Sequence, residues 1–134
     1  MEKLQDIFSK IGGSGIKQII KGVNTNFDPS DRKEWQIADV KFGISGAEHV
    51  NECINLFVDS VKRRDEGLMK PIKEEIDGII FATSRLKDLL SKKLSKTEIS
   101  RDDQICMRIF LKFIEVQIPE FINYAEQLDK EYSE

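Results

Sequence analysis

The segment after Ser100 most constrains the fold, because apolar side chains recur there at steps of three and four to the end of the chain. A helix on a protein surface needs an apolar stripe only somewhat wider than 100°. This segment is apolar around much of its circumference. We therefore predict one long helix, buried against several neighbours at the centre of an all-helical bundle. Its apolar positions are Ile105, Cys106, Ile109, Phe110, Leu111, Phe113, Ile114, Val116, Ile118, Phe121, Ile122, Tyr124, Ala125, Leu128 and Tyr132.

Size and composition fit one such domain over residues 1–134. The chain is 40% hydrophobic, enough for a core, and 34% charged, as expected when many helix faces are solvated. It contains no uncharged apolar stretch long enough to span a bilayer and no signal-peptide pattern. We expect a soluble cytoplasmic protein in which Cys53 and Cys106 are buried free thiols.

The N-terminal segment, residues 1–24, has apolar residues at helical spacing and several lysines between them. Gly12-Gly13-Ser14-Gly15 interrupts it, and each glycine costs about 1 kcal/mol relative to alanine inside a helix. We predict two short helices joined by a glycine hinge at 12–15. A phosphate-binding loop is disfavoured, because no strand precedes the glycines and Lys17 is not followed by Ser or Thr.

The bundle itself is predicted to span residues 28–134. Asp28-Pro29 is typical of a helix start. We predict a helix from there to about Lys41, although residues 35–44 partly alternate in the manner of a strand. Ser45-Gly46-Ala47-Glu48 matches a capping box and predicts a second helix, ending near Gly67.

Lys70-Pro71 begins a further helix with an apolar stripe, in which Gly78 is expected to allow close approach of a neighbour. Pro119 lies inside the last helix and predicts a kink. Because every connection is short, neighbouring helices should be antiparallel. The expected fold is a single-domain, all-α antiparallel bundle of five or six helices with a long, Pro-kinked C-terminal helix at its centre.

Charge gives little support to nucleic-acid binding. The net charge is −3, and the basic residues gather at 62–64 and at Lys92, Lys93 and Lys96. Antiparallel packing would place these two groups at opposite ends of the bundle. Basic residues in the last turn of a helix also complement its dipole. A nucleic-acid partner is therefore the least favoured of the macromolecular alternatives.

No catalytic, cofactor or metal site is predicted. His49 and Cys53 are one helical turn apart, as in half of a metal site, but the sequence offers no second pair of ligands. The carboxylates lie on polar faces or at helix starts, where they act as caps and solubilising groups. We expect neither an enzyme nor a small-molecule substrate.

Function is then expected to lie on the surface. We predict a binding protein that acts on a protein partner or on itself. The amphipathic N-terminal helix leaves a membrane surface as the alternative, and nucleic acid as a further one. Any uncovered part of the C-terminal stripe should form a dimer interface. The candidate interaction residues are Phe8, Ile11, Lys17, Ile20, Trp35 and Phe42.

Overall fold

The computed structural model describes residues 4–27, 31–95 and 99–132, except for the side chains of residues 5, 7–13 and 132. The described residues form four α-helices and one 3-10 helix, and none of them lies in a strand. The all-α prediction is confirmed, whereas the predicted count of five or six helices is not. The elements are α1 (Leu4–Asn24), α2 (Glu34–Arg64), η1 (Glu66–Ile72), α3 (Lys73–Ser95) and α4 (Arg101–Tyr132).

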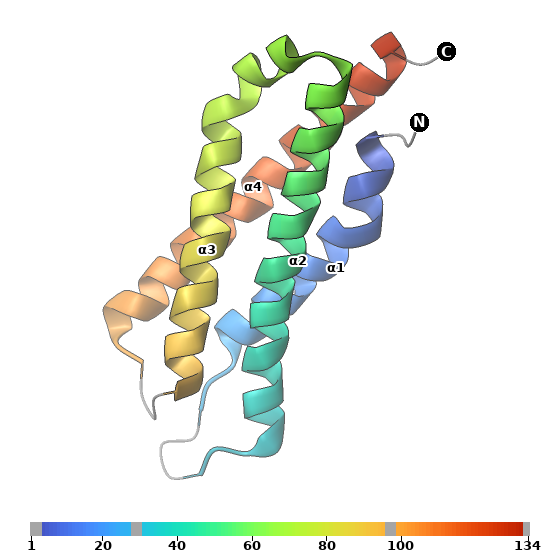
Figure 1. The fold of residues 1–134 in the computed structure, drawn as a ribbon. Helices are drawn as coiled ribbons and strands as arrows, with labels where there is room; N and C mark the ends of the chain where they lie inside the picture. The colour runs from blue at the N-terminus through green and yellow to red at the C-terminus, as the bar shows by residue number, and fades with distance from the viewer. Residues whose placement is uncertain (1–3, 28–30, 96–98, 133–134) are drawn as a thin grey trace.

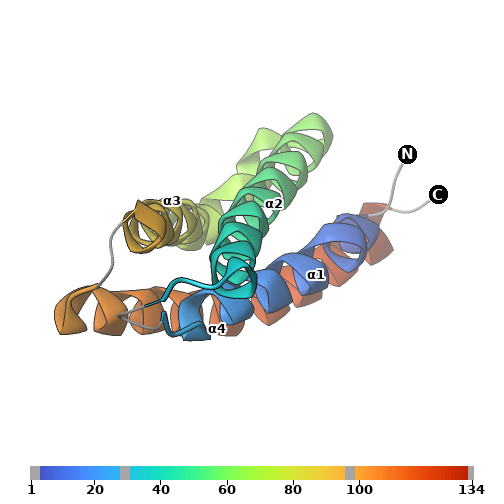
Figure 2. The same ribbon diagram turned by 90° about the horizontal axis from the view of Figure 1, so that it is seen from below.

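Consecutive helices run up and down, so that α1 is antiparallel to α2, α2 to α3, and α3 to α4 (Figure 1). α1 also packs along α4, which closes the ring of neighbours. Seen from below, α1 and α4 lie together in one layer, and α2 and α3 lie in the other (Figure 2). Each helix therefore has two main neighbours, and α1–α2 is the most extensive contact.

The glycine hinge predicted at 12–15 is wrong, because α1 is one unbroken helix through those residues. The helix start predicted at Ser45-Gly46-Ala47-Glu48 is also wrong, because these residues lie in the middle of α2. The first prediction rested on the low helix propensity of glycine, and the second on a match to the capping-box pattern. The structure shows a packing role for those glycines whose surroundings it describes.

Glycines of α1 and α2 face each other where the two helices are closest. A Cβ atom on Gly46 would lie 2.5 Å from the carbonyl oxygen of Gly15, and one on Gly22 would lie 2.8 Å from the Cα of Gly43. No side chain fits between backbones this close. The cost in helix propensity is offset by burial of the whole contact, and all four glycines are buried.

α2 begins at Glu34, later than the start predicted at Asp28, and residues 28–30 lie outside the described part. The start is fixed by Gln36. Its Oε1 accepts a hydrogen bond from the Lys33 backbone N–H at 2.8 Å, and its Nε2 donates to the Asn26 carbonyl at 2.7 Å. Residues 35–44 are helical, so the helix favoured there is confirmed, but it continues past the end predicted near Lys41.

α4 matches the predicted last helix, but it does not occupy the centre of the bundle. It packs against α1 and α3, and its buried residues alternate at steps of four and three, as in a heptad seam. Pro119 lies within this helix. The seam consists of Met107, Leu111, Ile114, Ile118, Phe121, Ala125 and Leu128.

One end of the bundle is held together by a buried lysine. Lys93, near the end of α3, is 3% exposed. Its ammonium donates hydrogen bonds to the carbonyls of Gly22 at 3.1 Å and Val23 at 3.0 Å, and Gln104 also donates to Val23 at 2.9 Å. These donors satisfy carbonyls at the end of α1, which have no partner within the helix. α1, α3 and α4 are thereby joined.

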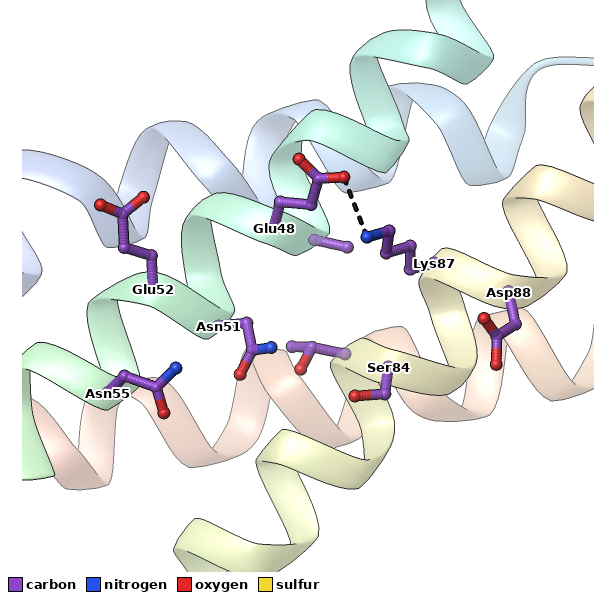
Figure 3. Close-up of a pocket in the computed structure, with 9 residues that line it drawn as sticks. Glu48, Asn51, Glu52, Asn55, Ser84, Lys87 and Asp88 are labelled. Carbon is purple, nitrogen blue, oxygen red and sulfur yellow. Dashed lines mark ion pairs between the residues drawn. The ribbon is translucent and has the colours of Figure 1, made fainter.

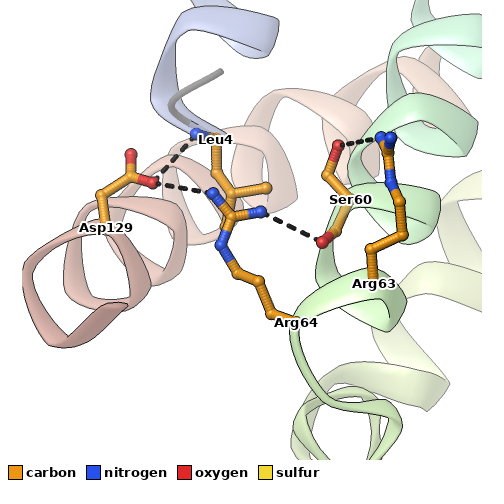
Figure 4. A network of polar contacts seen from close by, with 5 residues as sticks. All are labelled: Leu4, Ser60, Arg63, Arg64 and Asp129. Atoms are coloured by element: carbon orange, nitrogen blue, oxygen red, sulfur yellow. Dashed lines mark hydrogen bonds and ion pairs between the residues drawn. The ribbon is translucent and has the colours of Figure 1, made fainter. Parts of the chain in front are cut away.

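The opposite end carries an ion pair at the start of α1 (Figure 4). The Leu4 backbone N–H donates to Asp129 Oδ1 at 3.0 Å, and Arg64 lies 3.7 Å from the same oxygen. Arg64 also donates to the Ser60 carbonyl at 3.0 Å. The carboxylate at the end of α4 therefore caps α1 and anchors the last residue of α2.

Candidate functional site

The outer face of α4 exposes large apolar side chains. Ile105, Ile109 and Val116 are 42%, 60% and 49% exposed. Each stands two residues from a member of the buried seam. Because successive residues in a helix are rotated by about 100°, a step of two places them on the side away from the core.

Aromatic residues continue this apolar surface from α4 onto α3. Phe81 of α3 is 59% exposed, and its ring packs edge-on against Phe110 of α4 with centroids 5.9 Å apart. Phe113 fills the space beside Gly78, where a Cβ would lie 2.9 Å from its Cζ. The prediction that Gly78 admits a neighbouring helix is therefore confirmed. Cys106 is exposed beside these residues, so its predicted burial is wrong.

We define the α3–α4 apolar surface as Phe81, Ile105, Cys106, Ile109, Phe110, Phe113 and Val116. Its α4 members follow one another at steps of one and three residues and so form a continuous strip along the helix. The four most exposed side chains together present roughly 400 Å² of apolar area, a size at which patches on monomeric proteins are commonly functional.

Trp35 and Phe42, two of the predicted interaction residues, are exposed, as expected, but charged side chains lie among the apolar ones around them. Trp35 is 57% exposed, and Phe42 lies two turns further along the same helix. The Lys21 ammonium lies 5.9 Å from the centre of the Phe42 ring, and it also lies 3.7 Å from an Asp39 carboxylate oxygen. Charged groups therefore cover part of this surface.

The other predicted residues do not join Trp35 in one patch. Lys17 is exposed and Ile20 is half-buried. The side chains of Phe8 and Ile11 lie outside the described part of the structure. Their backbones belong to the first half of α1, and because α1 and α2 are antiparallel, they lie far from the start of α2 (Figure 1). The predicted surface is thus divided between the two ends of the molecule.

A polar hollow of about 470 Å³ lies between α2 and α3 (Figure 3). Glu48 and Lys87 form an ion pair of 3.1 Å across it, and the buried Oδ1 of Asn51 accepts no hydrogen bond. Binding sites for small molecules are lined mainly by apolar and aromatic groups. This hollow contains no aromatic wall, and its remaining lining residues are Ala47, Glu52, Asn55, Thr83, Ser84 and Asp88.

His49 and Cys53 do not share an accessible site. His49 is exposed, with Nδ1 3.1 Å from Gln18 Oε1, whereas Cys53 is fully buried in the core. Burial, with a smaller contribution from the charge of Glu52, raises the pKa of the Cys53 thiol to about 12. The thiol therefore stays protonated at neutral pH and is a poor nucleophile. Within the described residues, no group of three or more His, Cys, Asp or Glu side chains is placed to hold a metal ion.

The two basic groups lie at opposite ends, as the sequence indicates, and several of their charges are used internally. Arg64 pairs with Asp129. Lys92 forms an ion pair with Asp103, and Lys93 is buried at the end of α1. Lys96 lies outside the described residues. These contacts leave less positive charge on the surface than the sequence alone suggests.

The α3–α4 apolar surface was anticipated only as an unspecified remainder of the C-terminal stripe. The sequence does hold a sharper signal. The residues from Met107 to Leu128 form one regular seam of alternating four- and three-residue steps, whereas Ile105, Ile109 and Val116 fall outside it. Separating these two series would have marked the second as exposed.

Comparisons with known proteins give no relatives: no protein-family model, no curated protein and no solved structure matches the chain. Among the described residues, no helix combines the length and the apolar character that crossing a lipid bilayer requires.

Proposed function

We propose that this chain is a non-catalytic helical binding protein that recognises another protein surface through the α3–α4 apolar surface. The observation that supports this most is the exposure of Ile109 and Phe81, which are 60% and 59% accessible although both are large and apolar. Contiguous apolar surface of this kind is stabilised by burial against a partner, at about 25 cal/mol per Å².

The arrangement of the helices favours a protein partner over the membrane alternative. A membrane-binding amphipathic helix presents its apolar face to lipid. In α1, Leu4, Ile19 and Val23 are fully buried within the bundle, and Lys93 holds the end of the helix. Membrane binding through α1 would require these contacts to break first.

A binding experiment with two matched variants tests the proposal. Wild type, Ile109→Glu and Trp35→Ala would each be immobilised and exposed to lysate of the native host, with bound proteins identified by mass spectrometry. We expect specific binding by wild type, retention by Trp35→Ala and loss by Ile109→Glu. Equal binding by wild type and Ile109→Glu, with both variants folded by circular dichroism, would contradict the proposal.

A further inference from the structure

We infer that the α3–α4 apolar surface binds a second copy of this chain, with the two α4 helices side by side and antiparallel. This inference rests on the proposed function and makes it more specific, because it names the occupant of the surface. It is supported by the order of apolar residues along α4, by the charges at the edge of the surface and by its area.

The apolar side chains along α4 have nearly the same spacing when the helix is followed in the opposite direction. The strip is therefore complementary to a second, antiparallel copy of itself. In a two-fold symmetric contact, a residue i that meets j is accompanied by j meeting i. If two antiparallel α4 helices cross near residue 111, Ile105 lies within about one residue, or about 1.5 Å along the axis, of the level of Val116 of the second copy. Ile109 then lies level with Phe113 of the second copy. The exposed strip thus covers itself to within about one residue of a single register.

The same register pairs opposite charges. Arg108 and Glu115 are both exposed and stand two turns apart, so they lie along the same edge of α4. In the antiparallel arrangement, Arg108 lies within about one residue of the level of Glu115 of the second copy, which the two long side chains can span, and symmetry repeats this pair. In a parallel arrangement each residue lies level with its own copy, so these charges stay two turns apart and unpaired.

The remaining charges beside the strip are balanced, with Arg101 and Lys112 against Asp102 and Glu120. A surface of a single sign would repel its own copy, whereas a balanced one suits a symmetric contact. The α3–α4 apolar surface, Phe81 included, presents roughly 400 Å², about half of the roughly 800 Å² that standard interfaces bury per partner, so the polar rim has to supply the remainder. An apolar centre with a polar rim is also their usual composition.

Charge-reversal variants of Arg108 and Glu115 test the alignment of the two α4 helices directly, with dimer dissociation measured by sedimentation velocity. The proteins are wild type, Arg108→Glu, Glu115→Arg and the double variant that carries both changes. We expect a wild-type dimer. Each single change should raise the dimer dissociation constant by about tenfold or more, because like charges then meet at two places. The double variant should return to within about threefold of wild type, because both pairs are restored with reversed sign.

Lys62→Glu is the matched control, since it alters net charge equally on α2, away from the proposed contact. Circular dichroism and melting temperature confirm folding of every variant. The inference is overturned if the double variant is as weak as the single ones, if Lys62→Glu weakens the dimer equally, or if wild type stays monomeric at several hundred micromolar. In that last case the binding experiment with Ile109→Glu still decides the proposed function, because it needs no second copy.

Discussion

Glycines make the contact between α1 and α2, whereas phenylalanines make much of the contact between α3 and α4. Without Cβ atoms, the first two helices approach until backbone meets backbone, as Gly46 and Gly15 show. Phe110 and Phe113 pack against the core between the second pair, and Phe81 touches Phe110 by its edge while most of its ring is exposed to solvent. Small residues therefore close one interface, while large ones leave apolar surface available for another molecule.

The largest effect on stability is expected for Gly46→Ala, which tests the close contact between α1 and α2. The added Cβ would lie 2.5 Å from the Gly15 oxygen and 2.6 Å from the Gln18 Cβ, so backbone must move. Overpacking of this kind outweighs the gain in helix propensity, which is about 1 kcal/mol. We expect a net loss of about 3 kcal/mol in the free energy of unfolding, measured by urea denaturation. Unchanged stability would show that α1 and α2 are not in backbone contact.

Lys93 of α3, whose ammonium donates hydrogen bonds to the end of α1, joins the two helix pairs and gives a pH-dependent test. Burial, and to a lesser degree the charge of Arg108, lowers the pKa of Lys93 to about 8. Between pH 8 and its ordinary pKa of about 10.4, the unfolded chain binds more protons at this site than the folded chain. Lys93 therefore makes the free energy of unfolding rise with pH across this window, by about 1 kcal/mol per unit.

Lys93→Met lacks this titration and serves as the reference. The stability of wild type minus that of Lys93→Met should increase from pH 8 to pH 9.5 in urea denaturation. Cys53, whose raised pKa acts in the opposite direction above pH 9, is present in both proteins and cancels in the difference. A difference that stays flat or falls over this range would refute the lowered pKa of Lys93.

Gly78→Ala is the counterpart of Gly46→Ala in the α3–α4 contact. The new Cβ would lie 2.9 Å from Cζ of Phe113, at the tip of a half-buried ring that can shift toward solvent. We expect a change within about 1 kcal/mol in either direction, because the gain in helix propensity offsets the displacement of the ring. A loss as large as that of Gly46→Ala would mean that the two interfaces are equally rigid.

The smallest effect on folding is expected for Phe81→Ala. This side chain is mostly exposed, so its removal should change the free energy of unfolding by less than about 0.5 kcal/mol. Thermal melts of dilute protein measure this change. The same variant should weaken binding, since Phe81 contributes apolar area to the surface. A large loss of stability with unchanged binding would assign Phe81 to the core.

The sequence predicted the regular parts of the fold well. The spacing of apolar residues placed the last helix, and the start signal at Asp28-Pro29 favoured helix over strand for the residues up to about Lys41. It failed where α1 and α2 meet, because helix propensity predicted a hinge at 12–15 and a capping-box match predicted a helix start at 45–48, whereas contact between the helices makes Gly15 and Gly46 packing residues. That contact joins segments distant in sequence, so no local pattern reports it. For this reason α1 and α2 are continuous at residues 12–15 and 45–48, where breaks were predicted.

The candidate site was only partly predictable for the same reason. Trp35 and Phe42 were correctly expected at the surface, but the cation beside Phe42 comes from α1. The exposed face of α4 depends on which neighbours cover it, and that is set by the ring order of the four helices. The apolar residues of α4 were visible in the sequence, and the regular steps of the seam distinguish its buried members, but the sequence does not show which helices cover them.

The most direct test of the central claim is sedimentation of wild type and Ile109→Glu side by side at about 100 µM, with their unfolding free energies measured on the same samples after dilution. The outward position of Ile109 predicts that the variant is as stable as wild type within about 0.5 kcal/mol and that only wild type associates. A variant that unfolds readily, or that associates as strongly as wild type, would contradict the account.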